Sequence, residues 1–182
     1  MIYRDKSGDI TADELQMALT NGTEYSTFLV YSYLLMRSNL FIVRLGNWTP
    51  FNIETVRLMI NLFDRDHNGT INYQEFAGLW RYIEDWQRCF LGFDKDHSGY
   101  IDAQELQEAL RAFGYNLTPQ FISLLIRKYD GRGRGDLSFD NFIQICVTIR
   151  SLTESFRRFD TDSDGWILIN YEQFLELVLS NR

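Results

Sequence analysis

The sequence contains only two cysteines among its 182 residues, and it has no cluster of lysine and arginine. Cys89 and Cys146 are too few for a disulfide framework and lie among apolar residues, so we expect small core side chains in a reducing compartment. The 18 basic residues are outnumbered by 25 acidic ones, which gives a formal net charge of −7. This balance excludes a protein that binds nucleic acid by neutralising phosphates, and cations are the expected inorganic partners.

The sequence also lacks an N-terminal targeting segment and any pairing of a nucleophile with a base. Cys89 continues an apolar helix face, while His67 and His97 fall at outward-facing positions of acidic loops. We therefore expect a protein without catalytic activity, in the cytoplasm or the nucleus. With 45% hydrophobic and 24% charged residues, the chain has the material for a folded core.

Five related segments recur along the chain. Each contains aspartate and ends in a glycine, and an aliphatic residue follows two positions later. The glycines are Gly8, Gly69, Gly99, Gly135 and Gly165, and the aliphatic residues are Ile10, Ile71, Ile101, Leu137 and Ile167. Apolar residues at helical spacing precede the last four segments and return after them. The repeat is therefore a helix, an acidic loop and a helix, and the aliphatic positions predict short β pairing between loops.

Two of these loops carry a complete set of oxygen ligands for calcium. A calcium ion takes six to eight oxygens, which a 12-residue loop supplies from positions 1, 3, 5, 7, 9 and 12, with glycine at position 6. Position 7 contributes its main-chain carbonyl. The predicted ligands are Asp64, Asp66, Asn68, Thr70, Asn72 and Glu75 in one loop, and Asp94, Asp96, Ser98, Tyr100, Asp102 and Glu105 in the next. Two full matches between helices predict two calcium sites rather than solvated turns.

The loops on either side of this pair depart from the ligand set. In the fourth loop, Arg132 and Arg134 occupy positions 3 and 5 and Asn141 occupies position 12, so we expect an empty, structural loop. In the first loop, position 1 is Tyr3. The remaining ligands of the first loop are Asp5, Ser7, Asp9 and Glu14, which we expect to form an incomplete site.

The fifth loop has its acidic residues but lacks the closing glutamate. Position 12 is Tyr171, and the glutamate comes one residue late at Glu172. We expect weak or magnesium-like binding there. The ligands concerned are Asp160, Asp162, Asp164 and the carbonyl of Trp166.

Five such repeats, the last two of them degenerate, resemble the penta-EF-hand family. The resemblance covers residues 1–23 and 48–182. Its motifs are Trp48-Thr-Pro-Phe-Asn52, Trp80-Arg-Tyr-Ile-Glu-Asp-Trp86-Gln, Phe113-Gly-Tyr115, Leu125-Ile-Arg-Lys128, Gly133-Arg-Gly135, Phe156-Arg-Arg-Phe-Asp160 and Asp164-Gly-Trp166-Ile. The family's Gly/Pro-rich tail and first entering helix are missing. We expect an all-α, N-terminally truncated penta-EF-hand fold that carries an insertion.

The repeats divide the expected single domain, residues 1–182, into five hands. Residues 1–23 form a partial hand one, and residues 24–47 are an atypical insertion. The remaining hands are hand two at 51–84, hand three at 85–114, a degenerate hand four at 118–150 and hand five at 151–182.

The resemblance implies a calcium sensor and adaptor that works in vesicle transport and apoptosis, including at endoplasmic reticulum exit sites. Its partners would be Pro/Tyr-rich segments of ESCRT-associated and COPII coat proteins. The implied peptide groove consists of Trp48, Phe51, Trp80, Ile83 and Phe142. Spacing alone favours a core position for such an aromatic stripe, whereas the resemblance favours the groove for Trp48, Trp80 and Ile83. Asn116 stands where close relatives carry an arginine that is thought to gate the pocket.

An odd number of hands leaves the fifth without a loop to pair with. The resemblance implies a homodimer, or a heterodimer with another penta-EF-hand protein, through hand five. Burial of an apolar patch against a second copy gives an independent motive for this dimer, while packing inside the same subunit is the alternative. The patch comprises Trp166, Ile167, Phe174 and Leu175.

The insertion interrupts the regular spacing of the repeats. Gly8 and Gly69 are 61 residues apart, whereas the later glycines are 30, 36 and 30 apart. Residues 24–47 are apolar except for Glu24, Arg37 and Arg44, and the central Arg37 argues against a membrane-spanning helix. A membrane-surface or partner-binding helix is a second interpretation. We favour a third, in which the segment is a gene-model artefact such as a translated intron.

Two other functions are compatible with the same loops. A passive calcium buffer would bind the ion with little exposure of apolar surface. A regulatory subunit of a calpain-like cysteine protease would co-purify with the protease, although the Trp48-Thr-Pro and Trp80 to Trp86 segments speak against it.

Overall fold

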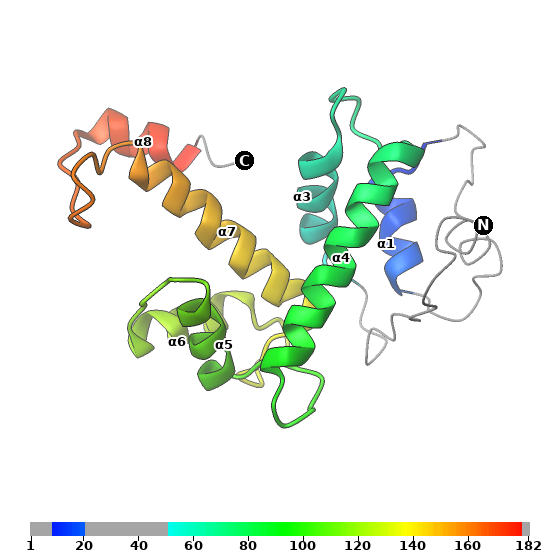
Figure 1. The fold of residues 1–182 in the computed structure, drawn as a ribbon, viewed down its shortest axis with the longest axis horizontal. Helices are drawn as coiled ribbons and strands as arrows, with labels where there is room; N and C mark the ends of the chain where they lie inside the picture. Colours follow the sequence, from blue (N-terminus) through cyan, green and yellow to red (C-terminus); the bar gives the residue numbers. More distant parts are fainter. Residues whose placement is uncertain (1–8, 21–50, 180–182) are drawn as a thin grey trace. The chain divides into compact units, whose positions relative to one another are not determined.

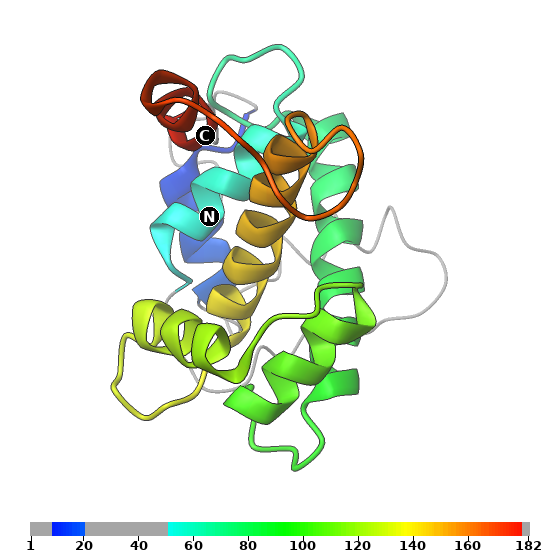
Figure 2. The same ribbon diagram turned by 90° about the vertical axis from the view of Figure 1, so that its left-hand side faces the viewer.

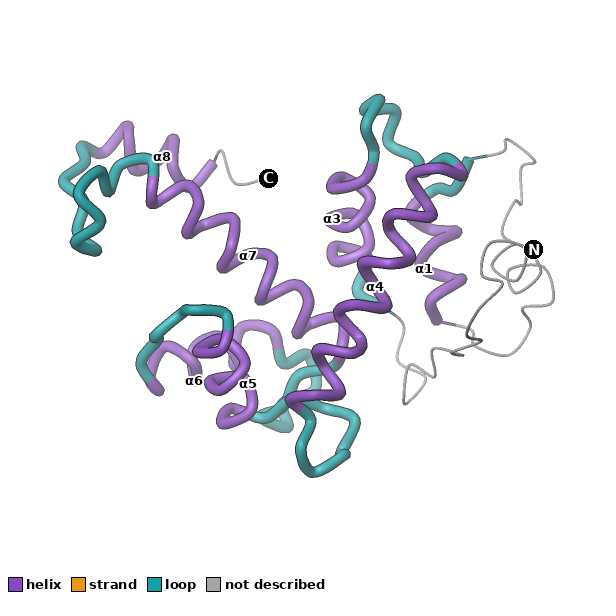
Figure 3. The backbone as a smooth tube through the Cα atoms, viewed as in Figure 1, coloured by secondary structure: helices purple, strands orange, loops and turns teal. Residues whose placement is uncertain are grey.

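The computed structural model describes residues 9–20 and 51–179 of the chain. This part is helical, and no strand longer than a single bridge occurs in it (Figure 3). The helices are α1 (Ala12–Thr20), α3 (Ile53–Phe63), α4 (Tyr73–Phe93), α5 (Ala103–Ala112), α6 (Pro119–Tyr129), α7 (Phe139–Arg157) and α8 (Tyr171–Leu179) (Figure 1). The predicted all-α fold of helix–loop–helix repeats is confirmed. The insertion at 24–47 and the first eight residues of hand one lie outside the described residues.

The chain divides into two compact units, with the boundary inside α7 between Phe142 and Ile143. In the first unit, consecutive helices pack in chain order: α1 against α3, α3 against α4, α4 against α5, and α5 against α6. The apolar positions predicted from helical spacing form its core. They include Val56, Met59, Ile60, Phe90, Leu106, Ala109, Leu110, Ile122, Leu125 and Ile126, all of which are buried. Leu79 and Ile83 on α4 are buried as well.

Helix α4 is one continuous helix of 21 residues (Figure 1 and Figure 2). It begins at the loop of hand two and ends at the loop of hand three, so it is both the exit helix of one hand and the entering helix of the next. The boundary that we drew between residues 84 and 85 therefore falls in the middle of a helix. A rigid element connects the two loops with complete ligand sets.

Aromatic rings close the core beside the C-terminal half of α4. Phe90 makes edge-on contacts with Phe139 and Phe142, with ring centroids 5.4 and 5.6 Å apart. Trp86 contacts Phe142 in the same manner at 5.9 Å, and Phe51 contacts Phe139 at 5.9 Å. Such edge-to-face pairs stabilise a core beyond the area that they bury.

The loops pair two by two through the predicted aliphatic positions. Ile10 and Ile71 form an antiparallel bridge with two N–H···O bonds of 2.9 Å, and Ile101 and Leu137 form an identical one. All four side chains are buried. The predicted β pairing between loops is therefore confirmed for hands one and two and for hands three and four. Ile167 of hand five has no such bridge within the described residues.

No helix in the described ranges 9–20 and 51–179 combines the length and the apolar character that a membrane span requires.

Because Leu137 is fully buried at the bridge, its truncation should leave a cavity between hands three and four. We predict that Leu137→Ala lowers the free energy of unfolding by about 2–5 kcal/mol, measured by urea denaturation. The matched control is Leu124→Ala on α6, where the side chain is 49% exposed and the expected change is within about 0.5 kcal/mol. Equal losses from the two variants would contradict the role of the bridge.

Candidate metal centres

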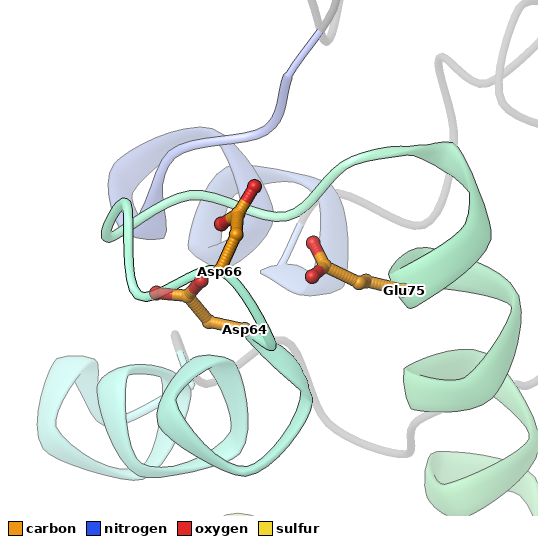
Figure 4. Close-up of side chains that lie close together, drawn as sticks. All are labelled: Asp64, Asp66 and Glu75. Carbon is orange, nitrogen blue, oxygen red and sulfur yellow. The ribbon is translucent and has the colours of Figure 1, made fainter.

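Three carboxylates converge in each of the two loops with complete ligand sets. In hand two, one carboxylate oxygen from each of Asp64, Asp66 and Glu75 lies within 4.8 Å of the others. Figure 4 shows Glu75 pointing from the start of α4 toward the two aspartates on the loop. In hand three, a group of the same geometry consists of Asp94, Asp96 and Glu105.

The first aspartate of each loop gathers main-chain N–H groups from the turn. The carboxylate of Asp64 accepts from the N–H of Asn68 at 3.1 Å and from that of Gly69 at 2.8 Å. Asp94 accepts in the same way from Ser98 and Gly99, at 3.0 Å each. These bonds need the chain to turn sharply at position 6, where both glycines have a φ near +80°, a conformation that a side chain disfavours.

The closing glutamate of each loop is also a helix cap. Asn72 accepts from the N–H groups of Gln74 and Glu75, and the Glu75 carboxylate accepts from the N–H of Asn72 at 3.0 Å, which completes a capping box. The other Glu75 oxygen accepts from the N–H of Arg65 at 2.8 Å. In hand three, Asp102 and Glu105 form the same box, and the Glu105 carboxylate accepts from the main-chain N–H of Lys95 at 2.8 Å. The requirements of the helix start and of the metal loop thus fix the same two positions, 9 and 12.

Hydrogen bonds lower the pKa of one aspartate in each of these two loops. Burial alone would raise the pKa of Asp64, but hydrogen bonds from the N–H groups of Gly69 and Asn68 outweigh it and lower that pKa. The hydroxyl and the N–H of Ser98 lower the pKa of Asp96. Both side chains therefore carry their negative charge well into mildly acidic solution.

This donor set fits a calcium ion. The first and last carboxylates of each loop are buried although they face other carboxylates within 4.8 Å, and like charges in this arrangement disfavour one another. A bound dication would supply the opposite charge, and the all-oxygen set with a glutamate able to offer both oxygens is the calcium type of site. Asn68, Thr70, Asn72, Ser98, Tyr100 and Asp102 stand at the remaining ligand positions of the two loops.

The loop of hand four is stabilised by interactions among its own residues. The Arg132 guanidinium pairs with Asp136 at 2.8 Å. Asp130 accepts from the N–H groups of Arg132, Gly133 and Gly135, and the bond from Gly135 is the main cause that lowers its pKa. Asn141, at position 12, donates to the carbonyl of Tyr129 at 2.7 Å instead of facing the loop centre. No carboxylate group suited to a metal occurs here among the described residues.

In hand five the exit helix starts two residues later than in hands two and three. Asn170 and Gln173 exchange hydrogen bonds of 3.0 and 2.9 Å at the start of α8, so the capping pair stands at positions 11 and 14. The residue that corresponds to Glu75 is thus the neutral Gln173. Asp160, Asp162 and Asp164 still lie within 4.8 Å of one another, and the N–H of Trp166 donates to Asp164 at 2.7 Å. The Asn-x-x-Gln spacing was the signal in the sequence that could have located this helix start.

Hand one repeats the capping arrangement in part. Glu14 is buried and accepts from the N–H and the hydroxyl of Thr11, at 3.0 and 2.9 Å, so positions 9 and 12 are again paired. Asp9 is half-buried. Asp5 and Ser7 lie outside the described residues.

The predicted groove residues lie mostly in the core. Phe51, Ile83 and Phe142 are buried, with exposed fractions of 4%, 0% and 0%. Trp80 is half-buried, and its indole N–H donates to Glu84 at 2.9 Å. Trp48 lies outside the described residues. The groove stays a prediction, because its three buried members must become exposed before they can contact a peptide.

The second unit exposes the apolar residues predicted for dimerisation. Trp166 and Phe174 are 82% and 50% exposed, and Ile167 and Leu175 are half-buried. Helix α8 has no buried residue. The prediction omitted Leu168 and Tyr171, which are exposed on the same segment and which the apolar run from Trp166 onward could have indicated.

Comparisons with known proteins agree with this geometry. A model of an EF-hand domain pair matches residues 83–147, and an EF hand domain model matches residues 55–81. Sorcin from Schistosoma japonicum is 48% identical over 171 residues, which cover 94% of this chain and 85% of that protein. Human sorcin is 38% identical over 175 residues, covering 96% and 77%. Human peflin is 37% identical over 177 residues, which cover 97% of this chain but only 54% of that longer protein.

A solved structure shares the fold. A homolog of programmed cell death 6 protein from Leishmania major Friedlin superimposes with a TM-score of 0.75 over 100% of this chain and 90% of that one. Its sequence identity is 24%, so the likeness concerns the fold alone.

The two closing glutamates allow each metal centre to be removed separately. We predict that Glu75→Gln and Glu105→Gln each weaken calcium binding at one site by about ten- to a hundredfold, because a charged ligand becomes neutral. Calorimetric titration would count the remaining site. Glu54→Gln, at an exposed position on α3, is the control and should leave both sites intact. Two undiminished sites in either loop variant would contradict the assignment of that glutamate as a ligand.

Proposed function

The chain belongs to the penta-EF-hand family, and from this premise we propose that it is a calcium sensor and adaptor. Calcium would bind at hands two and three. The two ligand sets are of the kind found in sensors with dissociation constants of about 10⁻⁷–10⁻⁵ M.

The observation that carries the proposal is the placement of α4 between the two carboxylate groups. Glu75 stands at its first turn, and Asp94 caps its last turn through an N–H bond to Phe90 of 2.9 Å. Both loops therefore act on the ends of one rigid helix. A change in how Glu75 and Glu105 hold their loops would be transmitted to the core residues that α4 packs.

The aromatic contacts of α4 supply the surface that such a movement would expose. Ile83, Phe90 and Phe142 are buried in the core, where the rings of Phe90 and Phe142 are in contact. Trp80 lies one helical turn before Ile83 on α4 and is already half-buried. Reorientation of helices that uncovers apolar side chains is the switching mode of sensor EF hands. We propose that the partner is an extended Pro/Tyr-rich segment of ESCRT-associated or COPII coat proteins, since proline-rich ligands dock on aromatic side chains.

Hand five has a separate role in the proposal. Its exposed patch, defined by Trp166, Ile167, Phe174 and Leu175, would bind a second copy of the chain or another penta-EF-hand protein. An apolar face of this kind on a helix without buried residues is typical of a subunit interface. Dimerisation would remove the unpaired loop that an odd number of hands leaves.

We predict two calcium sites in the wild-type chain and calcium-dependent retention on a hydrophobic resin. Titration by calorimetry in a magnesium background measures the sites, and elution with a chelator measures the exposure of apolar surface. Retention should disappear in the Glu75→Gln, Glu105→Gln double variant. Two sites without a change in retention would identify a passive buffer and would contradict the sensor function.

We also predict that Phe174→Glu converts a dimer into a monomer of 21.5 kDa, because a charge in the apolar patch would be buried without a partner. Sedimentation velocity over a range of concentrations measures the mass. Leu62→Glu, at a 53% exposed position on α3, is the control and should leave the dimer intact. If the wild-type chain is a monomer at all concentrations, the role of hand five is refuted.

A further inference from the structure

Arg132 belongs to the degenerate hand four. It stands at position 3, where a calcium loop carries an acidic ligand, and its Nη2 lies 2.8 Å from a carboxylate oxygen of Asp136 at position 7. The two side chains have exposed fractions of 27% and 24%, although Arg132 taken as a whole residue is exposed. A charged pair that is partly withdrawn from water in this way holds its geometry better than a surface pair does. The guanidinium thus joins two ligand positions of its own loop.

The same guanidinium also reaches the neighbouring loop. Its Cζ lies 3.8 Å from the centre of the Tyr100 ring, which is the distance of a close cation–π contact. Tyr100 stands at position 7 of hand three, and its main-chain carbonyl is a predicted calcium ligand. Since Ile101 and Leu137 bridge the two loops at the next residue, the contact lies directly beside the pairing of hands three and four.

We propose that Arg132 is a positioning residue for the calcium site of hand three. Its guanidinium, which belongs to hand four, fixes the ring of Tyr100 and thereby orients the main-chain carbonyl of Tyr100 toward the ion. The inference rests on the proposed calcium binding by hand three. Fixing a ligand before binding removes part of the ordering entropy that binding would otherwise lose, and this raises affinity without a new contact to the ion.

The charge of Arg132 is offset by its ion pair. Because Asp136 lies 2.8 Å from the guanidinium, the repulsion between Arg132 and a cation in the next loop is reduced. A lysine at this position would keep the charge but lose the planar surface that lies over Tyr100. The carboxylate of Asp130 accepts from three N–H groups of the loop and so holds the turn of hand four.

Hand two is held differently at the corresponding residue. Its position 7 is Thr70, whose hydroxyl donates to Asn68 of the same loop at 2.5 Å and whose N–H donates to the same oxygen at 2.8 Å. In both loops the main chain of position 7 is bonded to position 5 of the same loop, since in hand three the N–H of Tyr100 donates to the Ser98 hydroxyl at 3.3 Å and that hydroxyl donates to the Tyr100 carbonyl at 3.1 Å. The loops differ in the side chain of position 7: the Thr70 hydroxyl bonds within its own loop, whereas the ring of Tyr100 is held by Arg132 of the next hand. Loss of Arg132 should accordingly affect hand three and spare hand two.

The chain provides a separate reporter for each loop. The N–H of Gly69 donates to Asp64 and that of Gly99 donates to Asp94, so their amide resonances respond to ligation of hand two and hand three respectively. Calcium titration of the full chain, followed at these two amides by NMR, gives both affinities in one experiment. The variants are Arg132→Ala, Arg132→Lys and Tyr100→Leu, with Arg134→Ala as the matched control.

We expect Arg132→Ala to weaken calcium binding at Gly99 by about three- to tenfold, the size of a partly buried cation–π contact, and to leave Gly69 unchanged. Arg134→Ala removes the same charge from an exposed position two residues away and should change neither site. Arg132→Lys should not restore the affinity of hand three. Tyr100→Leu should produce the same loss, and its combination with Arg132→Ala should add little to either single change.

Any of the following results would overturn the inference. The first is an equal effect of Arg132→Ala and Arg134→Ala, which would assign the change to net charge. The second is full recovery with lysine, or additive losses in the double variant. The third is a wild-type chain in which Gly99 does not respond to calcium, which would refute the proposed function of hand three as well. Should the alanine variant unfold, Arg132→Lys and Tyr100→Leu carry the same comparison.

Discussion

The glutamate at position 12 is the constraint on which each calcium loop depends. In hands two and three it caps the N-terminus of the exit helix, it holds the N–H at position 2, and it faces the aspartates across the loop. The helix cannot begin elsewhere without moving the carboxylate, and the carboxylate cannot move without uncapping the helix. The loop is thereby shaped for a dication by the same hydrogen bonds that start the helix.

The degenerate hands show what happens when this coincidence is lost. Hand five keeps a capping pair, Asn170 with Gln173, but the pair has shifted by two residues and the acidic closing ligand is gone. Hand four has neither this capping pair nor an acidic residue at position 12, and an ion pair between Arg132 and Asp136 links positions 3 and 7 of its loop. In our proposals each departure has a structural use: hand four would position Tyr100 of hand three, and hand five would offer its exposed apolar face to another subunit. Divergence of the repeats would then distribute separate tasks over one motif.

The repeats and the convergence of carboxylates in hands two and three could be predicted from the sequence, because both depend on the fixed spacing between Asp64 and Glu75 and between Asp94 and Glu105. The sequence also predicted the loop bridges from the aliphatic residue after each glycine. It did not predict that α4 is continuous, because no residue in the run from Trp80 to Trp86 indicates whether the helix continues or breaks there. Spacing alone favours a core position for the aromatic stripe, and the structure buries Phe51, Ile83 and Phe142 in accordance with it. The contact of Arg132 with Tyr100 joins two loops and has no signature in either.

Hydrogen exchange of the loop amides, with and without calcium, tests the account most directly. The account predicts that calcium slows exchange at Gly69 and Gly99, whose N–H groups donate to the first aspartate of hands two and three. The N–H groups of Gly133 and Gly135 in hand four should exchange at the same rate in both conditions, because no carboxylate group suited to a metal occurs in that loop among the described residues. If exchange slowed at all four glycines alike, or at none of them, the result would contradict the claim that calcium binds at the loops of hands two and three and not at the whole set of hands.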